Sequence, residues 1–532
     1  MSNESQTRLE RKQAGVAGVG GEKTFFGHPR GLSTLFFTEM WERFSYYGIR
    51  PLLVLFMSAA LMEGGFGFDR DQASAIVGIY AGFVYLASLP GGWVADRLLG
   101  LRRAILWGGL LISLGHISIG LSAFGGARVP FFLGLMLIVA GTGLLKPNIS
   151  AIVGDLYPEG GARRDAGFSI FYMGINVGAF VGQLVTGFLG ETVGWHWGFS
   201  AAGVGMLLGL LTYVATAGKT LGDIGLEPVR HPDPAVQARQ ERRAKLALGG
   251  GVGVVALLWV LAVAGVIPLD AQAIGRSLTY VIVGCAVAYF AYLFLFGGLD
   301  GGEKKRVLVI GVLFLAAAVF WSAFEQAPTS LNLFAKDFTD REVAGLTIPA
   351  TWFQSINSFF IILLAPFFAS LWVGLAKWRG RDLSSPTKFA LGLGFAAVGF
   401  ALMIPAANAV VEGGAGTLVS PWWLVGSYFF QTVGELCLSP VGLSSMTKLS
   451  PKKYVGQMMG IWFMASAVGN LVAGLVGGRV DPERLEQMPQ LFGVTTATLL
   501  VAALVLVLLV VPIRRMLGEG SGRVQAAAVA GD

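Results

Sequence analysis

The chain has 532 residues, of which 54% are hydrophobic and only 13% are charged, and its formal net charge is +7. A soluble protein of this length needs more charge to cover its surface, so the composition excludes an ordinary water-soluble fold. The positive charge could suggest nucleic acid, but Lys and Arg lie mainly in alternate loops between apolar runs, which indicates membrane topology. We therefore expect the lipid bilayer as a partner and no nucleic acid.

Fourteen apolar runs are long enough to cross a hydrocarbon layer of about 30 Å, and each predicts a transmembrane helix. They lie near residues 32–60, 74–99, 104–124, 131–153, 166–190, 197–217, 246–268, 277–298, 307–333, 351–376, 387–406, 422–447, 457–478 and 491–513. Most Lys and Arg fall in the loops on the side that also holds both termini. By the positive-inside rule, we expect both termini in the cytoplasm.

The longest polar stretch between two spans separates six spans from eight, which predicts an all-α polytopic membrane protein of 6+6 helices plus a two-helix insertion. The extra helices carry no ionisable residue in mid-span, which favours a structural insertion. The predicted domains are an N-terminal cytoplasmic tail at 1–30, a six-helix bundle at 31–217, a cytoplasmic linker at 218–245, the two extra helices at 246–298, a second six-helix bundle at 299–515 and a cytoplasmic tail at 516–532.

The first span carries charges where they are expensive, since an ionisable group at mid-membrane costs about 2.5–3.5 kcal/mol on insertion scales. Its polar side chains recur at i, i+3, i+4, i+7, i+8 and i+11, a spacing that gathers them on one helical face. The members of this face are Glu39, Glu42, Arg43, Tyr46, Tyr47 and Arg50. Four charges and two tyrosines exceed what one structural ion pair needs, so we expect this face to line an aqueous cavity.

Four later spans add polar groups that also share a helical face within each span. Lys146 precedes Pro147, which interrupts the helical hydrogen-bond ladder and frees carbonyl groups. The other sets are Tyr172 with Asn176, Trp321 with Glu325 and Asn332, and Tyr428 with Glu435 and Ser439. Acids and bases therefore come from both halves and can meet only at a central interface.

Opposite charges at such an interface predict a proton-coupled switch. Pairing Lys146 with Glu325 or Glu435 would relieve the desolvation cost of each group. Protonation of the acid would strand the cation and favour another conformation. A zwitterionic peptide suits this cavity, with its carboxylate toward Arg43 and Lys146 and its ammonium toward Glu435.

An ordered set of motifs runs from about residue 30 to residue 515. The first half holds Glu39, Glu42, Arg43, Tyr46, Tyr47 and Gly48, then Asp96 and Arg97, then Gly141 through Lys146 to Asn148, and then Gly167 through Tyr172 to Asn176. The second half holds Phe320, Trp321, Glu325 and Gln326, then Gln354, Asn357 and Pro366, then Gly434, Glu435, Ser439 and Pro440, and then Gly460, Trp462, Gly469 and Asn470. Together they resemble the proton-dependent oligopeptide transporter family of the major facilitator superfamily.

The resemblance implies a bacterial inner-membrane protein with the major facilitator fold, which imports di- and tripeptides with protons by alternating access. It also implies a monomer driven by the proton gradient, with no cofactor. The implied proton-linked residues are Glu39, Glu42, Arg43, Lys146 and Glu325. The implied peptide-binding residues are Arg43, Tyr46, Tyr47, Arg50, Tyr85, Lys146, Asn176, Trp321, Asn357, Glu435, Ser439, Trp462 and Ser466.

The sequence departs from the family pattern at Ala179 and at Pro328, and Pro328 is expected to change the bend of its helix. Two alternatives keep the same pocket: a proton-coupled symporter of another small solute such as nitrate, and a transport-inactive membrane sensor. An enzyme is not expected, because the sequence shows no spacing of a nucleophile–base pair. The four histidines lie too far apart in sequence to suggest a metal site.

Overall fold

The computed structural model describes residues 24–123, 127–230, 232–268, 270–343, 345–380, 383–414 and 416–517. Most of the predicted tails, at 1–30 and 516–532, therefore lies outside the described residues. Each of the fourteen predicted spans coincides with a helical segment. Among the described residues, twelve such segments are long and apolar enough to cross a membrane. The remaining two, α2 (Gly31–Ser58) and α14 (Trp422–Leu449), both carry predicted site residues in their interiors.

The described residues form two compact units, and the first unit comprises residues 24–49 and 87–268. It contains the first part of α2 and the last part of α3 (Arg70–Val94), which continues into a π-helical turn at Ala95–Leu99. Its other helices are α4 (Leu101–Leu121), α5 (Arg128–Asp155), α6 (Gly161–Phe188) with a π-helical turn at Leu189–Val193, α7 (Trp195–Thr220) and α8 (Pro234–Val263).

The second unit comprises residues 50–86 and 270–517, and it contains the remaining parts of α2 and α3. A short 3₁₀ turn at Leu61–Glu63 joins these two helices, and a two-stranded antiparallel ribbon pairs β1 (Glu342–Val343) with β2 (Leu346–Thr347). The other helices are α9 (Ala271–Phe296), α10 (Gly301–Phe324), α11 (Asn332–Asp337), α12 (Trp352–Arg379), α13 (Ser385–Gly413), α15 (Val455–Gly477) and α16 (Gln487–Met516).

Glycines allow the helices of the first unit to pack backbone against backbone. α4 and α5 meet at two glycine pairs, Gly108 with Gly141 and Gly115 with Gly134. A Cβ added at any of these four would lie 2.5–2.7 Å from the carbonyl oxygen of its partner. Small residues are favoured at membrane helix contacts because they let backbones approach closely. The abundance of glycine in the sequence, 76 residues, is thus used in packing.

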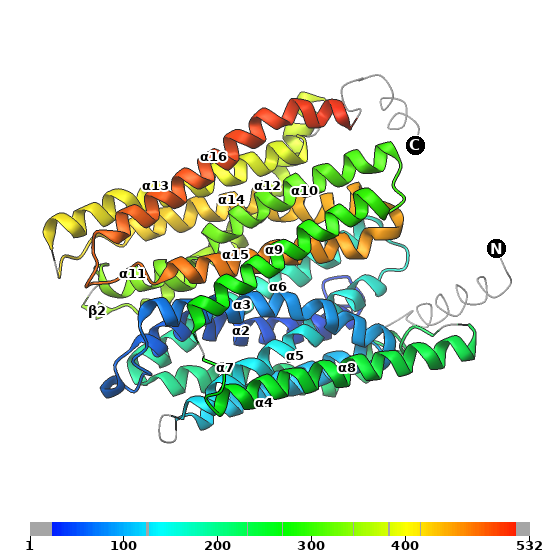
Figure 1. Cartoon of the computed structure of the whole chain (residues 1–532), viewed down its shortest axis with the longest axis horizontal. Coiled ribbons are helices and arrows are strands. Elements are labelled where there is room, and N and C mark those ends of the chain that lie inside the picture. Colours follow the sequence, from blue (N-terminus) through cyan, green and yellow to red (C-terminus); the bar gives the residue numbers. More distant parts are fainter. Residues whose placement is uncertain are drawn as a thin grey trace. The chain divides into compact units, whose positions relative to one another are not determined.

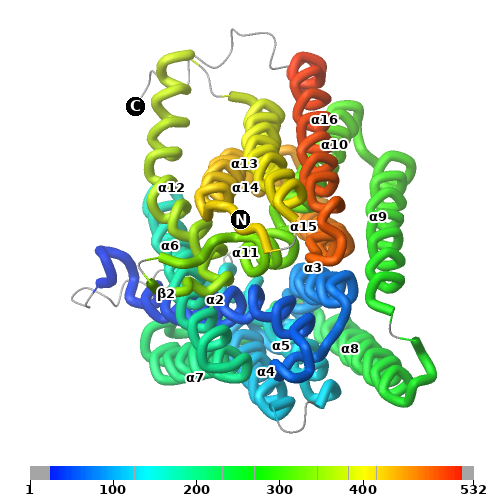
Figure 2. The backbone as a smooth tube through the Cα atoms, turned by 90° about the vertical axis from the view of Figure 1, so that its left-hand side faces the viewer, coloured from blue at the N-terminus to red at the C-terminus, as the bar shows by residue number. Residues whose placement is uncertain are grey.

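In the second unit, α13 packs between α14 and α16, and α15 packs against both α9 and α10. α13 and α16 run side by side in both views of the backbone (Figure 1 and Figure 2). The helix α9, one of the two predicted extra helices, lies along α15 (Figure 1). Most side chains of α8 and α9 are exposed, as expected for helices whose outer faces meet lipid.

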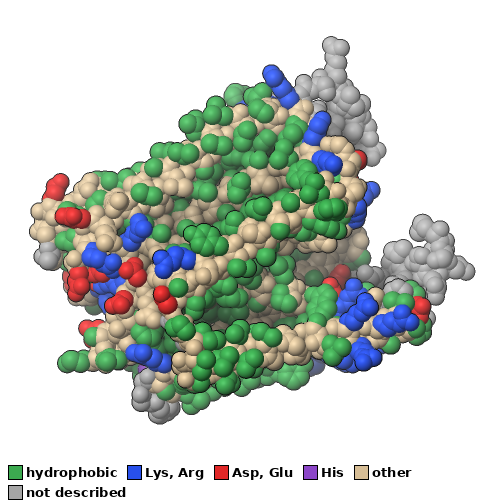
Figure 3. Space-filling view, in the orientation of Figure 1, with side chains coloured by type: hydrophobic (Ala, Val, Ile, Leu, Met, Phe, Trp, Pro, Cys, Tyr) green, Lys and Arg blue, Asp and Glu red, His purple; other side chains and the backbone are tan. Residues whose placement is uncertain are grey.

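The helix α8 begins inside the segment that the sequence predicted to be a linker, 218–245. The side chain of Asp233 accepts hydrogen bonds from the N–H groups of Ala235 and Val236, and Pro234 occupies the first helical position. Both features start a helix, so the basic residues 239–245 are helical. Figure 3 shows Lys and Arg gathered at one end of α8 and hydrophobic side chains along its length, a distribution that suits a span with its basic end in the headgroup region.

The compact units also differ from the predicted bundles at 31–217 and 299–515. Residues 50–86 precede the linker in sequence, yet in the structure they pack with residues 270–517. Asn332 illustrates this, because its amide donates a 2.7 Å hydrogen bond to the carbonyl of Pro51. The division into two six-helix bundles remains a prediction.

Candidate functional site

The charged face of α2 holds a buried cluster of two acids and one base in the first unit. Arg43 Nε lies 3.0 Å from Glu39 Oε1 and 2.5 Å from Glu42 Oε2, and all three side chains are at most 2% exposed. A buried charge is tolerated when it is paired, and here one guanidinium serves two carboxylates. The sequence predicted these three residues on one face, and the structure brings them together.

Neighbouring helices fix the position of this cluster. Gly178 and Gly182 of α6 lie against the backbone of α2, where an added Cβ would be 2.1 Å from the Met40 carbonyl and 2.4 Å from the Phe44 carbonyl. From α5, Thr142 Oγ1 donates a 3.4 Å hydrogen bond to Glu42. Thr142 was not predicted from the sequence, although it lies one turn before Lys146 and so shares its face.

Aromatic and polar side chains surround the cluster. The guanidinium of Arg43 lies 5.3 Å from the ring centre of Tyr46, and the Tyr46 and Tyr47 rings meet edge to face at 5.1 Å. Asn176 is buried on α6 and donates a 3.0 Å hydrogen bond to the Tyr172 carbonyl. The first unit thus contributes a cation–π contact from α2 and a buried side-chain amide from α6.

Lys146 is half-buried on α5, just before Pro147. Because proline has no N–H, the ladder of α5 is interrupted there. The side-chain amide of the next residue, Asn148, donates to the Leu144 carbonyl at 2.6 Å and reaches the Gly91 carbonyl at 3.5 Å. The predicted interruption at Pro147 therefore leaves α5 helical and adds a side chain–backbone bond beside Lys146.

A second charged group lies in the second unit. Arg50 Nη2 forms an ion pair with Glu325 Oε2 and also donates a 3.2 Å hydrogen bond to Asn470 Oδ1. All three side chains are buried. The sequence assigned Arg50 to peptide binding and Glu325 to proton coupling, and the structure joins them directly. The sequence predicted no role for Asn470, although it lies i+4 from Ser466 and i+8 from Trp462 on one face of α15.

The helix that carries Glu325 breaks at this residue. α10 ends at Phe324, and a π-helical turn at Ala327–Leu331 containing Pro328 leads into α11. Pro328 lies within this turn, and its expected effect on the bend of the helix stays a prediction. The carboxyl end of a helix carries a partial negative charge, so the end of α10 and the Glu325 carboxylate both favour the Arg50 cation.

A third polar group joins α12 to α14. Asn357 Nδ2 donates hydrogen bonds of 2.9 Å to Thr432 Oγ1 and 3.1 Å to Glu435 Oε2. Asn357, Glu435 and Ser439 are half-buried, so a small solute can reach them. Thr432 was missed in the sequence, although it lies three residues before Glu435 and so close to its face.

The predicted aromatic pocket residues of the second unit are held in place by close helix contacts. A Cβ added at Gly469 would lie 2.3 Å from Trp321 Cβ, and one at Gly442 would lie 2.1 Å from the Trp462 ring. Trp321 Nε1 is buried and has no hydrogen-bond partner among the described residues. Because buried N–H groups are normally paired, this indole N–H suits an acceptor on a bound solute. Ser466 is buried beside them on α15, and Tyr85 is half-buried on α3.

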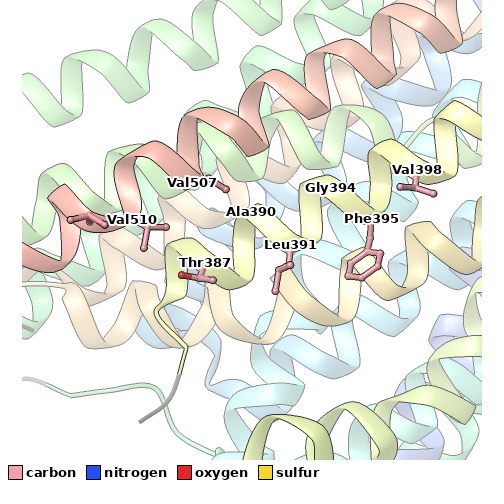
Figure 4. Close-up of a pocket in the computed structure, with 9 residues that line it drawn as sticks. Thr387, Ala390, Leu391, Gly394, Phe395, Val398, Val507 and Val510 are labelled. Carbon is pink, nitrogen blue, oxygen red and sulfur yellow. The ribbon is translucent and has the colours of Figure 1, made fainter. Parts of the chain in front are cut away.

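An apolar hollow between α13 and α16 lies apart from these polar groups. Its walls are formed by side chains such as Ala390, Leu391, Phe395, Val507 and Val510 (Figure 4). Its lining residues carry no charge, so it offers no counter-charge to the two ends of a peptide. Its chemistry suits hydrocarbon.

The predicted site residues thus fall into two groups, one in each unit. The first unit holds Glu39, Glu42, Arg43, Tyr46, Tyr47, Lys146 and Asn176, and the second holds Arg50, Tyr85, Trp321, Glu325, Asn357, Glu435, Ser439, Trp462 and Ser466. The pairing of Lys146 with Glu325 or Glu435 joins residues of different units and stays a prediction. Within the described residues, we find no group of three His, Cys, Asp or Glu side chains that could hold a metal ion.

Comparison with known proteins gives consistent matches over most of the chain. The model of the POT family matches residues 102–220 and 276–484. The peptide transporter YePEPT of Yersinia enterocolitica is 52% identical over 508 residues, which cover 94% of this chain and 98% of that protein. A di-/tripeptide transporter of Lactococcus lactis subsp. cremoris is 37% identical over the same shares of the two chains. A crystal structure of a peptide transporter POT in complex with sulfate has a TM-score of 0.86 and 42% identity, and the match covers 95% of this chain and 99% of that chain.

Proposed function

Because the chain belongs to the POT family of membrane transporters, we propose that it imports di- and tripeptides in symport with protons by alternating access. The observation that carries this proposal is the set of buried, paired charges on membrane helices: Arg43 with its two acids and Arg50 with Glu325. Such charges are expensive in a membrane protein, so they are rarely present unless they serve transport or conformational switching. The names of the relatives support peptides as the cargo.

Glu325 is the proposed proton switch of the second unit. Protonation would neutralise its carboxylate and so remove this counter-charge from Arg50, which also donates a hydrogen bond to the neutral oxygen of Asn470. A buried guanidinium without a counter-charge is strongly disfavoured, so the unit would move to a conformation that hydrates Arg50 or supplies another anion. The carboxylate of a peptide is one such anion, which couples proton binding to peptide binding.

The triad of α2 is suited to accept a proton without losing its ion pair. Two carboxylates share Arg43, so when Glu39 or Glu42 is protonated the other still balances the guanidinium. This cluster therefore changes net charge by one while the arginine stays paired. We propose that it takes part in proton coupling together with Lys146.

The peptide is proposed to bind by its two charged ends. Arg43 and Lys146 would hold its carboxylate, and Glu435, oriented by Asn357, would hold its amino end. Asn176 would bind the peptide backbone. Tyr46, Tyr47, Arg50, Tyr85, Trp321, Ser439, Trp462 and Ser466 would line the rest of the pocket.

We propose a monomer in a bacterial inner membrane with both termini in the cytoplasm, which needs no cofactor because the proton gradient drives it. A membrane potential of about 100 mV supplies about 2.3 kcal/mol for each charge moved inward. This is enough to accumulate a neutral solute roughly 50-fold.

Uptake into proteoliposomes with an imposed pH gradient tests this function. The wild type should accumulate labelled dialanine, whereas Glu325→Gln and Lys146→Ala should lose accumulation driven by the gradient. Unlabelled dipeptide should compete, and nitrate should not. Competition by nitrate alone would point to a different cargo, and a wild type that takes up neither solute would favour a sensor.

A further inference from the structure

The first turn of α3 is enclosed by segments from the far end of the chain. Arg70 pairs with Asp337 of α11 at 2.5 Å and donates a 3.0 Å hydrogen bond to the Val480 carbonyl. Arg484 lies 3.1 Å from the Asp71 carboxylate. The loop between α15 and α16 thus contributes both a backbone and a side-chain contact to the start of α3.

α3 and α15 also touch directly along their backbones. A Cβ added at Gly78 would lie 2.6 Å from the Asn470 carbonyl, and one at Gly474 would lie 2.7 Å from Gly78 Cα. At the start of α3, a Cβ at Gly478 would lie 2.4 Å from the backbone of Asp71. Small residues allow such close contact between α3 and α15. Because glycine has no side chain, the two helices can also separate at these positions without disengaging packed side chains.

We call this contact between α3 and α15, at Gly78, Gly474 and Gly478, the seam. One polar side chain of the inserted helix α9 bridges it. Gln272 Nε2 donates a 2.8 Å hydrogen bond to the Asp71 carbonyl of α3 and lies 3.5 Å from the Leu475 carbonyl of α15. The side chain of Asp270 caps the start of α9 by accepting from the N–H groups of Gln272 and Ala273. The cap holds Gln272 in the first turn, where its amide reaches both neighbours.

The same face of α9 covers the seam further along with apolar side chains. Ile282 packs with Val468 and Leu471 of α15, and Ile79 and Leu86 of α3 pack against this cluster. Near the opposite end of α9, the Tyr289 hydroxyl donates a hydrogen bond to Gln457, close to the start of α15. α9 is therefore joined to α15 along its length and to α3 at Gln272 and in the apolar cluster.

We propose that α9 is a strap across the seam between α3 and α15, with Gln272 as its positioning residue. α3 belongs by sequence to the first predicted bundle and α15 to the second, so alternating access requires the two helices to separate at this end in every cycle. By the predicted topology this is the non-cytoplasmic end. The inserted helix α9 thereby sets how readily the non-cytoplasmic end opens. This role rests on the proposed function only in assuming an alternating-access cycle, not in the identity of the cargo.

Distances between spin labels test the strap without peptide or gradient. We would label Met62→Cys and Glu412→Cys, both exposed at this end, in a Cys285→Ser background in which Cys437 stays buried. Gln272→Glu keeps the shape of the side chain but removes the N–H donors, and Gln272→Ala removes the amide altogether. Both variants should raise the ratio of long to short distances about fivefold, the effect of losing one hydrogen bond.

The matched control is Ser277→Ala, which removes a polar group from an exposed position on the same helix. It should leave the distance distribution unchanged. Wild-type distances in both Gln272 variants would overturn the strap, even if peptide uptake is normal. Conversely, a shift in distances together with a wild type that takes up no peptide would support the strap and overturn the proposed cargo.

Discussion

The charged groups of the two units are built in different ways. In the first unit, Glu39, Glu42 and Arg43 lie on a single helix, one turn or less apart, so that the ion pairs form within α2 itself. In the second unit, Arg50 and Glu325 are 275 residues apart, and their ion pair exists only while α2 packs with the broken helix of α10. A cluster within one helix can therefore keep its ion pairs, and any bound proton, when the conformation changes. An ion pair between distant helices instead forms or breaks with the conformation.

The largest effect is expected from removing the shared base of the local cluster. Arg43→Ala leaves two buried carboxylates without a cation and should lower the free energy of unfolding by about 3–5 kcal/mol, whereas Arg50→Ala strands one carboxylate and should cost less. Unfolding in detergent micelles, followed by circular dichroism, measures both. Adding Glu39→Gln and Glu42→Gln to Arg43→Ala should restore much of the stability. An equal or smaller loss in Arg43→Ala would contradict the idea that one guanidinium balances both acids.

The next largest loss of stability is expected from disturbing the packing of α6 against α2, beside the local cluster. Gly182→Ala places a methyl group 2.4 Å from the Phe44 carbonyl and should cost about 1–3 kcal/mol, because helix backbones have little room to move. The matched control is Gly284→Ala, where the added Cβ meets nothing within 4 Å. Thermal unfolding of the two variants should show a lower midpoint for Gly182→Ala alone. Similar midpoints would mean that α6 does not hold α2 in place.

An effect of similar size is expected where Arg50 of the long-range pair meets its neutral partner Asn470. Asn470→Ala removes the acceptor that shares Arg50 with Glu325, and loss of a hydrogen bond to a charged group costs about 1.5–3 kcal/mol when the group stays buried. We expect uptake driven by the pH gradient to fall more than exchange of peptide across the membrane. Asn470→Asp would add a second carboxylate beside Arg50 and should change the dependence of uptake on pH. Unchanged uptake in both variants would exclude a role for this residue in coupling.

The smallest effect is expected for the hydrogen bond at the edge of the local cluster. Thr142→Val keeps the shape of the side chain but removes the donor to Glu42, at 3.4 Å a long contact. A loss of roughly 0.5–1 kcal/mol or less is expected, because Glu42 keeps its ion pair with Arg43. Chemical unfolding, compared with Thr142→Ser, measures it. A loss as large as that of Asn470→Ala would show that the triad depends on α5 as well as on α2.

The fold was predictable where it depends on local chemistry. Each of the fourteen predicted spans coincides with a helical segment, and among the described residues twelve of these segments are long and apolar enough to cross a membrane. Such a run needs no partner to be recognised. The sequence predicted one continuous span at 307–333, whereas the structure interrupts the helix after Phe324, close to Pro328. The start of α8 was missed, although Asp233 followed by Pro234 is a local signal for a helix start, because the polar composition of 218–245 suggested a linker.

The candidate site was predictable as a set of residues but not as a set of contacts. The sequence proposed Glu325 as a partner of Lys146 and Arg50 as a peptide ligand, whereas the structure joins Arg50 to Glu325. It named Asn357 and Glu435 but not Thr432, which binds the same amide. It gave the inserted helices a structural role without locating Gln272 against α3 and α15. In each case the missing information was which distant helices lie side by side.

By itself, the sequence determined that this chain spans a membrane many times and that α2 carries a face of opposite charges, because hydrophobic length and helical periodicity are properties of single segments. Only the tertiary structure decided that residues 50–86 pack with residues 270–517 and that Arg50 pairs with Glu325. The physical reason is that the packing of residues 50–86 uses close backbone approach at glycines such as Gly78 and Gly474, and the ion pair joins two helices that are distant in sequence. Such complementarity between two surfaces is not encoded in either segment alone.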